Sequence, residues 1–201
     1  GTVNGYRVES VGIFNLASNI GLKTQANGGF RLEGRVSARS TRLLSDGIAG
    51  FLGGNALISA RVGYGSDGVA TIDGLTIAAP AFRLANGRGR YDARGQIAFA
   101  ANASSDLYGP IRLSAKGSAA QPVLHLEAPR PGMGVGLAAL VADVRGAGGA
   151  YQVKARAASD YGPIGADLLV STARGPFAVD LRPGTSLAGI ALTGRVQQTA
   201  S

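Results

Sequence analysis

The sequence contains no cysteine and only one histidine, His125. The absence of cysteine excludes disulfide bonds and thiolate chemistry, although it does not identify a cellular compartment. Without cysteine or a second histidine, Cys-His pairs and the usual zinc sites are excluded, and a Ser-His-Asp triad has little support. We therefore expect a protein that is not an enzyme and that needs neither a metal nor a cofactor.

Aromatic residues are also scarce, at 6% of the chain, whereas hydrophobic residues reach 45%. The apolar surface is therefore mostly Ala, Val, Leu and Ile, which suits many narrow strands better than one thick core. No apolar run approaches the roughly 20 residues that a membrane-spanning helix needs. Because the chain starts at Gly1 rather than Met, we interpret it as an excised fragment or a processed chain, whose parent could carry a signal peptide or an anchor.

Acidic residues are fewer than basic ones, and the formal net charge is +8. Such a balance favours anionic partners in general, such as lipid headgroups, lipopolysaccharide or nucleic acid. The basic residues are scattered singly, however, as Arg31, Arg35, Arg61, Arg83, Lys116, Lys154 and Arg195. Scattering favours the solvated face of a sheet, and no basic cluster interleaved with aromatic residues supports nucleic-acid binding.

Turn-forming residues are abundant, with 32 Gly and 8 Pro. One turn sequence occurs twice, as Tyr108-Gly-Pro-Ile111 and as Tyr161-Gly-Pro-Ile164, each time shortly after Ser-Asp and before a segment with apolar residues at alternate positions. Proline fixes φ and lacks a backbone donor, so each copy predicts a turn that leads into a half-buried strand. We interpret 1–201 as one repetitive β-rich segment of a larger protein, with repeat units at about 91–150 and 151–201.

Alternation of apolar and polar residues recurs along the whole chain, with turn signals every 8–14 residues or so. This spacing is typical of consecutive antiparallel strands. The strands we expect are 6–11, 20–25, 30–37, 56–64, 69–73, 75–77, 82–84, 97–99, 111–115, 123–127, 135–144, 151–155, 164–170, 177–181 and 190–196.

The period changes once, over 40–53, where Leu43, Leu44, Ile48, Phe51 and Leu52 follow helical spacing. This pattern predicts one short amphipathic helix that begins at Ser40 or Thr41 and ends at Gly53-Gly54. Two internal glycines weaken it, so packing must hold it in place. It could close an end or an edge of the sheet, or contact a membrane or a partner.

The residues expected on the apolar face are small and aliphatic, unlike the bulky aromatic lining of a closed sandwich or small barrel. A sheet with one apolar and one polar face cannot bury these small apolar side chains by itself. It must curl into a trough, stack on a copy of itself, or hold something apolar. The fold we predict is all-β, a long antiparallel meander curled into an open groove.

The segments 47–60, 73–77 together with 82–84, and 87–97 resemble the repetitive β-rich regions of the AsmA-like superfamily, in particular its TamB and YdbH members. The later segments 129–137 and 146–153, together with the Tyr-Gly-Pro turns, are similar to the same proteins from alphaproteobacteria. The resemblance implies a periplasmic protein of a Gram-negative bacterium, anchored in the inner membrane, whose groove carries phospholipid acyl chains toward the outer membrane. It also implies partner proteins in both membranes, including an outer-membrane barrel assembly protein, and no catalytic residues.

The alternation and the resemblance together predict which side chains line the groove. They are Leu32, Val36, Ile97, Phe99, Ile111, Leu113, Leu124, Leu126, Val153, Leu168, Val170, Phe177, Val179, Leu181, Ile190 and Leu192. Structural or adhesive β-solenoids of the cell envelope share the glycine content and the alternation, and they stay an alternative.

Other candidate sites have weaker support. His125 shares a face with Val123 and Glu127 in an alternating segment, which predicts a solvent-side position rather than a catalytic or metal-binding one. The glycine-rich stretch 132–136 follows Pro129-Arg-Pro131 instead of a strand, so it does not fit a phosphate-binding loop. Asp160 and Asp167 could act as a carboxylate pair on sugars, but the aromatic platforms that usually accompany such pairs are missing.

Overall fold

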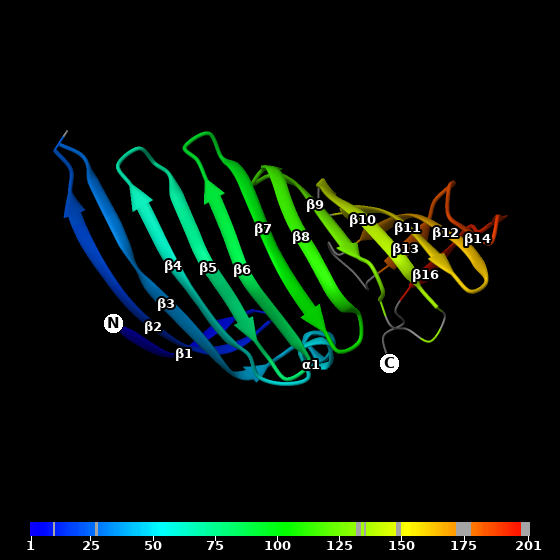
Figure 1. The fold of residues 1–201 in the computed structure, drawn as a ribbon, viewed down its shortest axis with the longest axis horizontal. Coiled ribbons are helices and arrows are strands. Elements are labelled where there is room, and N and C mark those ends of the chain that lie inside the picture. Colours follow the sequence, from blue (N-terminus) through cyan, green and yellow to red (C-terminus); the bar gives the residue numbers. More distant parts are fainter. Residues whose placement is uncertain are drawn as a thin grey trace. The chain divides into compact units, whose positions relative to one another are not determined.

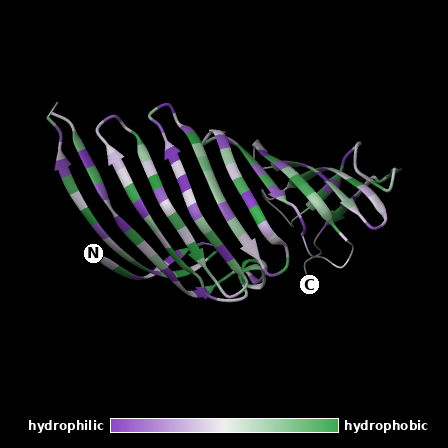
Figure 2. Ribbon diagram, viewed as in Figure 1, coloured by the Kyte–Doolittle hydropathy of each residue, from purple (hydrophilic) through white to green (hydrophobic). Residues whose placement is uncertain are grey.

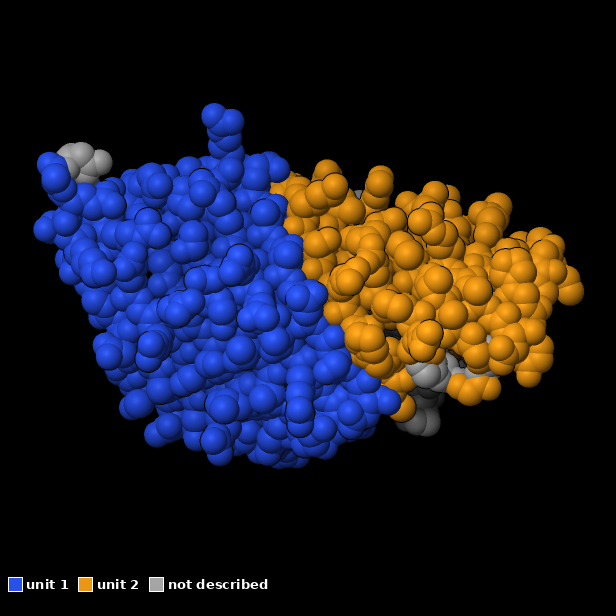
Figure 3. Space-filling model, viewed as in Figure 1, with its two compact units in different colours: residues 1–106 blue, residues 107–201 orange. Residues whose placement is uncertain are grey.

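The computed structural model describes residues 1–9, 11–26, 28–131, 134, 136–147, 150–171 and 178–197. The fold is all-β and antiparallel, an open sheet with one short helix (Figure 1), which confirms the predicted fold class. The chain divides into two compact units, residues 1–106 and 107–201 (Figure 3), which we call unit 1 and unit 2. Among the described residues, no helix has the length and hydrophobicity required to cross a membrane.

Unit 1 is a seven-stranded meander in which every strand pairs with its neighbours in the sequence. Its strands are β1 Thr2–Val8, β2 Gly12–Thr24, β3 Phe30–Leu43, β4 Leu57–Gly65, β5 Ala70–Ala78, β6 Phe82–Tyr91 and β7 Gln96–Ser105. Helix α1, Asp46–Leu52, lies between β3 and β4.

Unit 2 starts as a meander and becomes irregular toward its end. Its strands are β8 Gly109–Ser118, β9 Gln121–Ala128, β10 Ala138–Ala147, β11 Ala150–Ser159, β12 Gly162–Ser171, β13 Ala178–Leu181, β14 Ser186–Leu187, β15 Ile190–Ala191 and β16 Gly194–Gln197. Strands β8 to β13 pair in sequence order and β16 pairs with β13, whereas β14 and β15 form a short hairpin beside β12. The last predicted strand, 190–196, is thus split in two.

Both Tyr-Gly-Pro turns lead into strands, as predicted. Strands β8 and β12 begin at Gly109 and Gly162, whose φ values of 64° and 119° favour glycine. In the second turn the Ser159 hydroxyl accepts a hydrogen bond from the Tyr161 N–H at 3.3 Å and donates one to the Gly162 carbonyl at 2.7 Å. A side chain at the end of β11 therefore organises the turn into β12.

Several strands are longer than predicted because glycines did not end them. The expected break between 69–73 and 75–77 lies inside β5, where the register shifts between Ile72 and Leu75 and Gly74 has a φ of 62°. A bulge of this kind inserts a residue without ending the hydrogen-bonded ladder. Strand β6 similarly continues to Tyr91, far beyond the predicted end at Leu84. The first predicted residue of 135–144, Val135, lies outside the described residues.

The predicted helix exists, but its predicted start is wrong. Ser40 belongs to β3 and is 2% exposed, and its hydroxyl accepts a hydrogen bond from the Ala56 N–H at 2.7 Å. The N-cap is Ser45, whose hydroxyl accepts from the Ile48 N–H at 3.3 Å, and Gly53 ends the helix with a φ of 71°. The connection back to β4 therefore uses Ser40 as a buried polar anchor rather than as a cap.

Helix α1 packs against one end of the sheet of unit 1 (Figure 1). The Phe51 ring lies 4.9 Å from the Phe82 ring at the start of β6, and the Leu52 carbonyl accepts a hydrogen bond from the Ala81 N–H. Phe82 is buried, as are Phe14 and Leu84, at 8% and 6% exposure. This position fits the first of the two roles predicted for the helix, which was to close an end or an edge of the sheet.

Candidate functional site: the two faces of the sheet

Strand pairing in unit 1 separates apolar from polar side chains. Hydrophobic and hydrophilic residues alternate along the strands (Figure 2), and paired residues of neighbouring strands share a face. We call one of the two faces the apolar face of unit 1. Its hydrophobic side chains are Val3, Phe14, Leu16, Ile20, Leu22, Leu32, Val36, Ala38, Ile58, Ala60, Val62, Tyr64, Ile72, Leu75, Ile77, Phe82, Leu84, Tyr91, Ile97, Phe99, Ala101 and Ala103.

The two ends of this face differ in exposure. The end that α1 covers is buried, as Phe82 and Leu84 show. At the opposite end Leu22 is 64% exposed, Ile20 is 50% and Tyr64 is 45%. Large aliphatic side chains that stay open to solvent on one contiguous face are typical of a binding surface.

Part of the apolar face is hollowed near β1. A cavity of about 380 Å³ is lined on this face by Val3, Leu16, Val36, Ala38 and Ile58. Its other lining residues are small, and none has a charged side chain: Gly1, Thr2, Ala17, Ser18 and Ser37. Its volume lies in the range of ligand sites, and its chemistry suits a hydrocarbon.

Unit 2 has a corresponding apolar face. Cross-strand pairs such as Leu113 with Leu126, Val153 with Leu168 and Val170 with Val179 define it. Tyr151 and Ile190 on this face are 41% and 68% exposed. In the described part of unit 2, the buried apolar residues are few and mostly small: Ile111, Ala115, Ala128, Pro131 and Ala178.

The structure places the predicted lining residues in two groups, one in each unit. Leu32, Val36, Ile97 and Phe99 lie on the apolar face of unit 1. The members on the apolar face of unit 2 are Ile111, Leu113, Leu124, Leu126, Val153, Leu168, Val170, Val179, Leu181 and Ile190. Leu192 follows β15, and its N–H donates to the Thr185 carbonyl, while Phe177 lies outside the described residues. The prediction omitted Val62 and Ile72, although both lie at apolar positions of predicted strands.

The opposite side of unit 1, which we call its polar face, is rich in arginine. Its basic residues include Lys23, Arg31, Arg35, Arg39, Arg61, Arg83, Arg88 and Arg90, and its acidic residues include Glu33 and Asp73. Each acid is shared between two cations. Glu33 contacts Lys23 at 3.0 Å and Arg31 at 2.6 Å, and Asp73 contacts Arg61 at 3.0 Å and Arg88 at 3.5 Å. The hydrogen bond from Lys23 lowers the pKa of Glu33, so this carboxylate stays charged.

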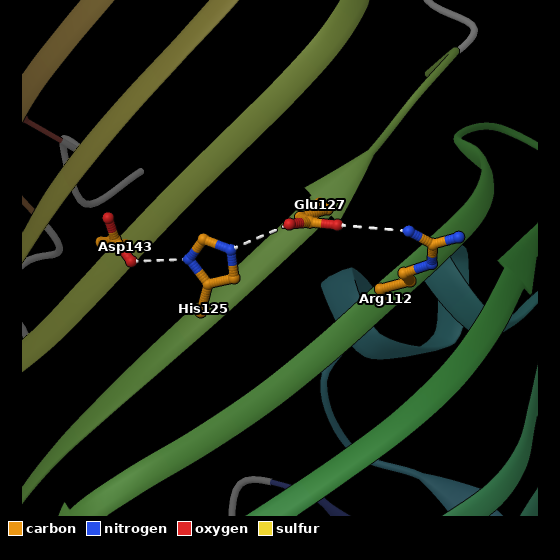
Figure 4. A network of polar contacts seen from close by, with 4 residues as sticks. All are labelled: Arg112, His125, Glu127 and Asp143. Atoms are coloured by element: carbon orange, nitrogen blue, oxygen red, sulfur yellow. Dashed lines mark hydrogen bonds and ion pairs between the residues drawn. The ribbon is translucent and has the colours of Figure 1, made fainter.

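A polar network on unit 2 centres on His125 (Figure 4). Its Nδ1 lies 2.7 Å from Asp143 Oδ1, and its Nε2 lies 3.3 Å from Glu127 Oε1. Glu127 also forms an ion pair with Arg112. The hydrogen bond to Asp143, followed by the one to Glu127, raises the pKa of His125. The His125 side chain is 38% exposed and shares its face with Glu127, the position predicted from the alternation.

Because the chain has one histidine, its titration can be followed by NMR without assignment. We expect a midpoint above the ordinary 6.5, and a lower midpoint in Asp143→Asn. A raised pKa means that the His125–Asp143 contact stabilises the fold fully below pH 6.5 and that this contribution is lost as the pH rises through the folded-state pKa. The stability difference between wild type and Asp143→Asn should therefore be larger at pH 6 than at pH 8. A midpoint that the substitution leaves unchanged would contradict the network.

Of the remaining sequence candidates, the structure describes Asp160 and Asp167. Asp167 lies on the polar face of unit 2, where a hydrogen bond from Gln152 lowers its pKa and Lys154 is 3.5 Å away. Asp160 lies in the turn between β11 and β12 and is exposed. Gly132, Met133 and Val135 of the glycine-rich stretch lie outside the described residues. Among the residues that are described, no cluster of three His, Asp or Glu side chains could hold a metal ion.

Comparisons with known proteins give no family. No protein-family model matches the chain, and neither a curated protein nor a solved structure is significantly similar to it. The resemblance to the AsmA-like superfamily thus stays a prediction from the sequence.

Proposed function

We propose that the apolar faces of the sheet bind the acyl chains of phospholipids, and that the chain is a segment of a bridge-like protein that carries lipid between two membranes. The observation that supports this most directly is the apolar face of unit 1, which lacks charge and is open at the end remote from α1. The apolar cavity near β1 lies on the same face.

Acyl-chain binding needs little from a protein beyond an accessible apolar surface. Burying hydrocarbon gains about 0.8 kcal/mol for each CH₂ group, without directional bonds. Side chains such as Val36 and Ile58, fixed by strand pairing on both sides, provide such a surface. Because one face does this and the other stays polar, one sheet can hold lipid and remain in water.

The cellular setting belongs to the proposal and rests on the AsmA-like resemblance alone. It comprises the periplasm, an inner-membrane anchor in the parent protein, partner proteins at both membranes, and an outer-membrane barrel assembly protein among them. The main alternative is a structural β-solenoid, which would enclose its apolar side chains in a closed core. The exposure of Ile20 and Leu22 gives that alternative less support.

Photocrosslinking tests the proposal with matched neighbours. A photoreactive residue at Leu113 or Val179, on the apolar face of unit 2, should trap phospholipid when the protein is expressed in a Gram-negative host. The same residue at Arg112 or Asp180, the adjacent positions on the polar face, should trap several-fold less. Equal trapping on both faces, or no lipid adduct at any of the four positions, would refute acyl-chain binding.

A further inference from the structure

A hollow lies on the polar face of unit 1, opposite the surface proposed for acyl chains. Two adjoining cavities, of about 570 and 600 Å³, share Asn19, Arg35, Arg61 and Asp73 among their lining residues. These four residues form one row across β2, β3, β4 and β5, because Asn19 pairs with Arg35, Arg35 with Arg61, and Arg61 with Asp73. We call this site the arginine hollow.

Small residues beside the row create the space. Gly21 and Gly63 lie on one side of it, and Ser37 and Ser59 on the other. At Gly63 a Cβ would lie 2.7 Å from the Thr71 hydroxyl oxygen, so a larger residue would crowd the hollow there.

The charges in the arginine hollow are not balanced within the protein. Arg35 and Arg61 are directly opposite each other, and like charges at such positions destabilise a sheet. Asp73 compensates Arg61, at 3.0 Å, and is itself shared with Arg88. Arg35 makes no ion pair or side-chain hydrogen bond within the described part of the chain. One guanidinium therefore stays free beside a second cation in a hollow.

The lining side chains indicate what class of ligand would fit. A guanidinium binds the oxygens of phosphate in pairs, and two neighbouring cations favour a doubly charged anion. Asn19, Ser59 and Thr71 add amide and hydroxyl groups that can hydrogen-bond sugar hydroxyls. No aromatic ring lines either cavity, which argues against stacking of a nucleobase.

We propose that the arginine hollow binds a phosphorylated sugar, with Arg35 and Arg61 holding the phosphate and the polar side chains around them holding the sugar. Each of the two cavities by itself lies in the volume range of small-ligand sites. This inference is independent of acyl-chain binding, because it uses the opposite face of the sheet. The phosphate could belong to a free sugar phosphate, which carries up to two charges, or to the headgroup of a sugar-containing phospholipid, whose phosphodiester carries one.

Titration calorimetry with glucose 1-phosphate tests the site. We expect saturable binding by the wild-type chain, at least tenfold weaker binding of inorganic phosphate, and none of glucose. Arg35→Gln should weaken binding of glucose 1-phosphate by 10- to 100-fold, because a hydrogen bond to a charged group is lost. Arg39→Gln, the same substitution on the same strand and face but outside the hollow, should change it less than twofold.

Vesicles distinguish the two sources of the ligand. The ligand is a lipid headgroup if the wild-type chain binds phosphatidylinositol vesicles but not phosphatidylcholine vesicles, and if Arg35→Gln abolishes that binding. The ligand is a free sugar phosphate if the chain binds glucose 1-phosphate and neither kind of vesicle. Circular dichroism should show the same fold for both variants, since Arg35 is exposed and faces a like charge. Absence of binding in both assays, equal affinity for inorganic phosphate, or equal losses in Arg35→Gln and Arg39→Gln would overturn the proposal.

Discussion

Replacing Phe82 by alanine should lower the free energy of unfolding by about 3–5 kcal/mol, as is usual for a buried phenylalanine. Phe82 is 7% exposed, and its ring packs 4.9 Å from that of Phe51, so it joins helix α1 to the sheet. Alanines make up much of the buried core of unit 1, including Ala56, Ala79 and Ala103. Such short side chains cannot move into the space that a lost ring leaves. Urea denaturation followed by circular dichroism measures the change.

Tyr91→Ala is the matched control for this experiment. Tyr91 lies on the same strand and the same face, but at the open end, where it is 45% exposed. Its truncation should cost much less, about 1 kcal/mol or below. If Phe82→Ala does not fold, Phe82→Leu provides a milder step in the same series. Equal losses for Phe82→Ala and Tyr91→Ala would mean that α1 does not create a buried end.

Ile58→Glu should weaken acyl-chain binding by about 10- to 100-fold. Ile58 lines the apolar cavity of unit 1 and pairs with Ala38 and Ile77 on the apolar face. A carboxylate there must either stay hydrated, which excludes hydrocarbon from the cavity, or lose its water at a cost of several kcal/mol. Titration with a fluorescent fatty acid gives the affinity.

The adjacent Leu57 provides the control for Ile58. It is also a large aliphatic residue on β4 and is 43% exposed, but it lies on the polar face between Arg39 and Ala78. Leu57→Glu introduces the same charge one position away and should leave the affinity within twofold of wild type. Parallel losses in both variants would indicate that charge on the chain, rather than the apolar face, controls binding.

Much of the fold could be predicted from local patterns. Side chains of a strand point alternately to opposite faces, so a period of two identifies both the strand and its two faces. For this reason Leu32 and Val36 could be assigned to one face, and His125 to the polar side, before any pairing was known. The Tyr-Gly-Pro turns were predictable because glycine and proline restrict the backbone within a few residues.

The limits of a strand depend on partners that are distant in the sequence. Ser40 was expected to cap the helix, as a serine before a helical pattern often does, but β3 continues through it because its hydroxyl binds the Ala56 backbone. Gly74 was expected to end a strand, yet the ladders to β4 and β6 on both sides continue past it. In both places tertiary hydrogen bonds override the local preference.

The sequence by itself determined that this chain forms many two-faced strands, with aliphatic residues on one side and charged residues on the other, because alternation is a local property of extended backbone. Only the tertiary structure decided which side chains meet. Arg35 and Arg61 look like scattered basic residues in the sequence, and the register between β3 and β4 makes them direct neighbours. Helix α1 likewise determines which end of the apolar face is closed, since burial at that end depends on the contact between Phe51 and Phe82.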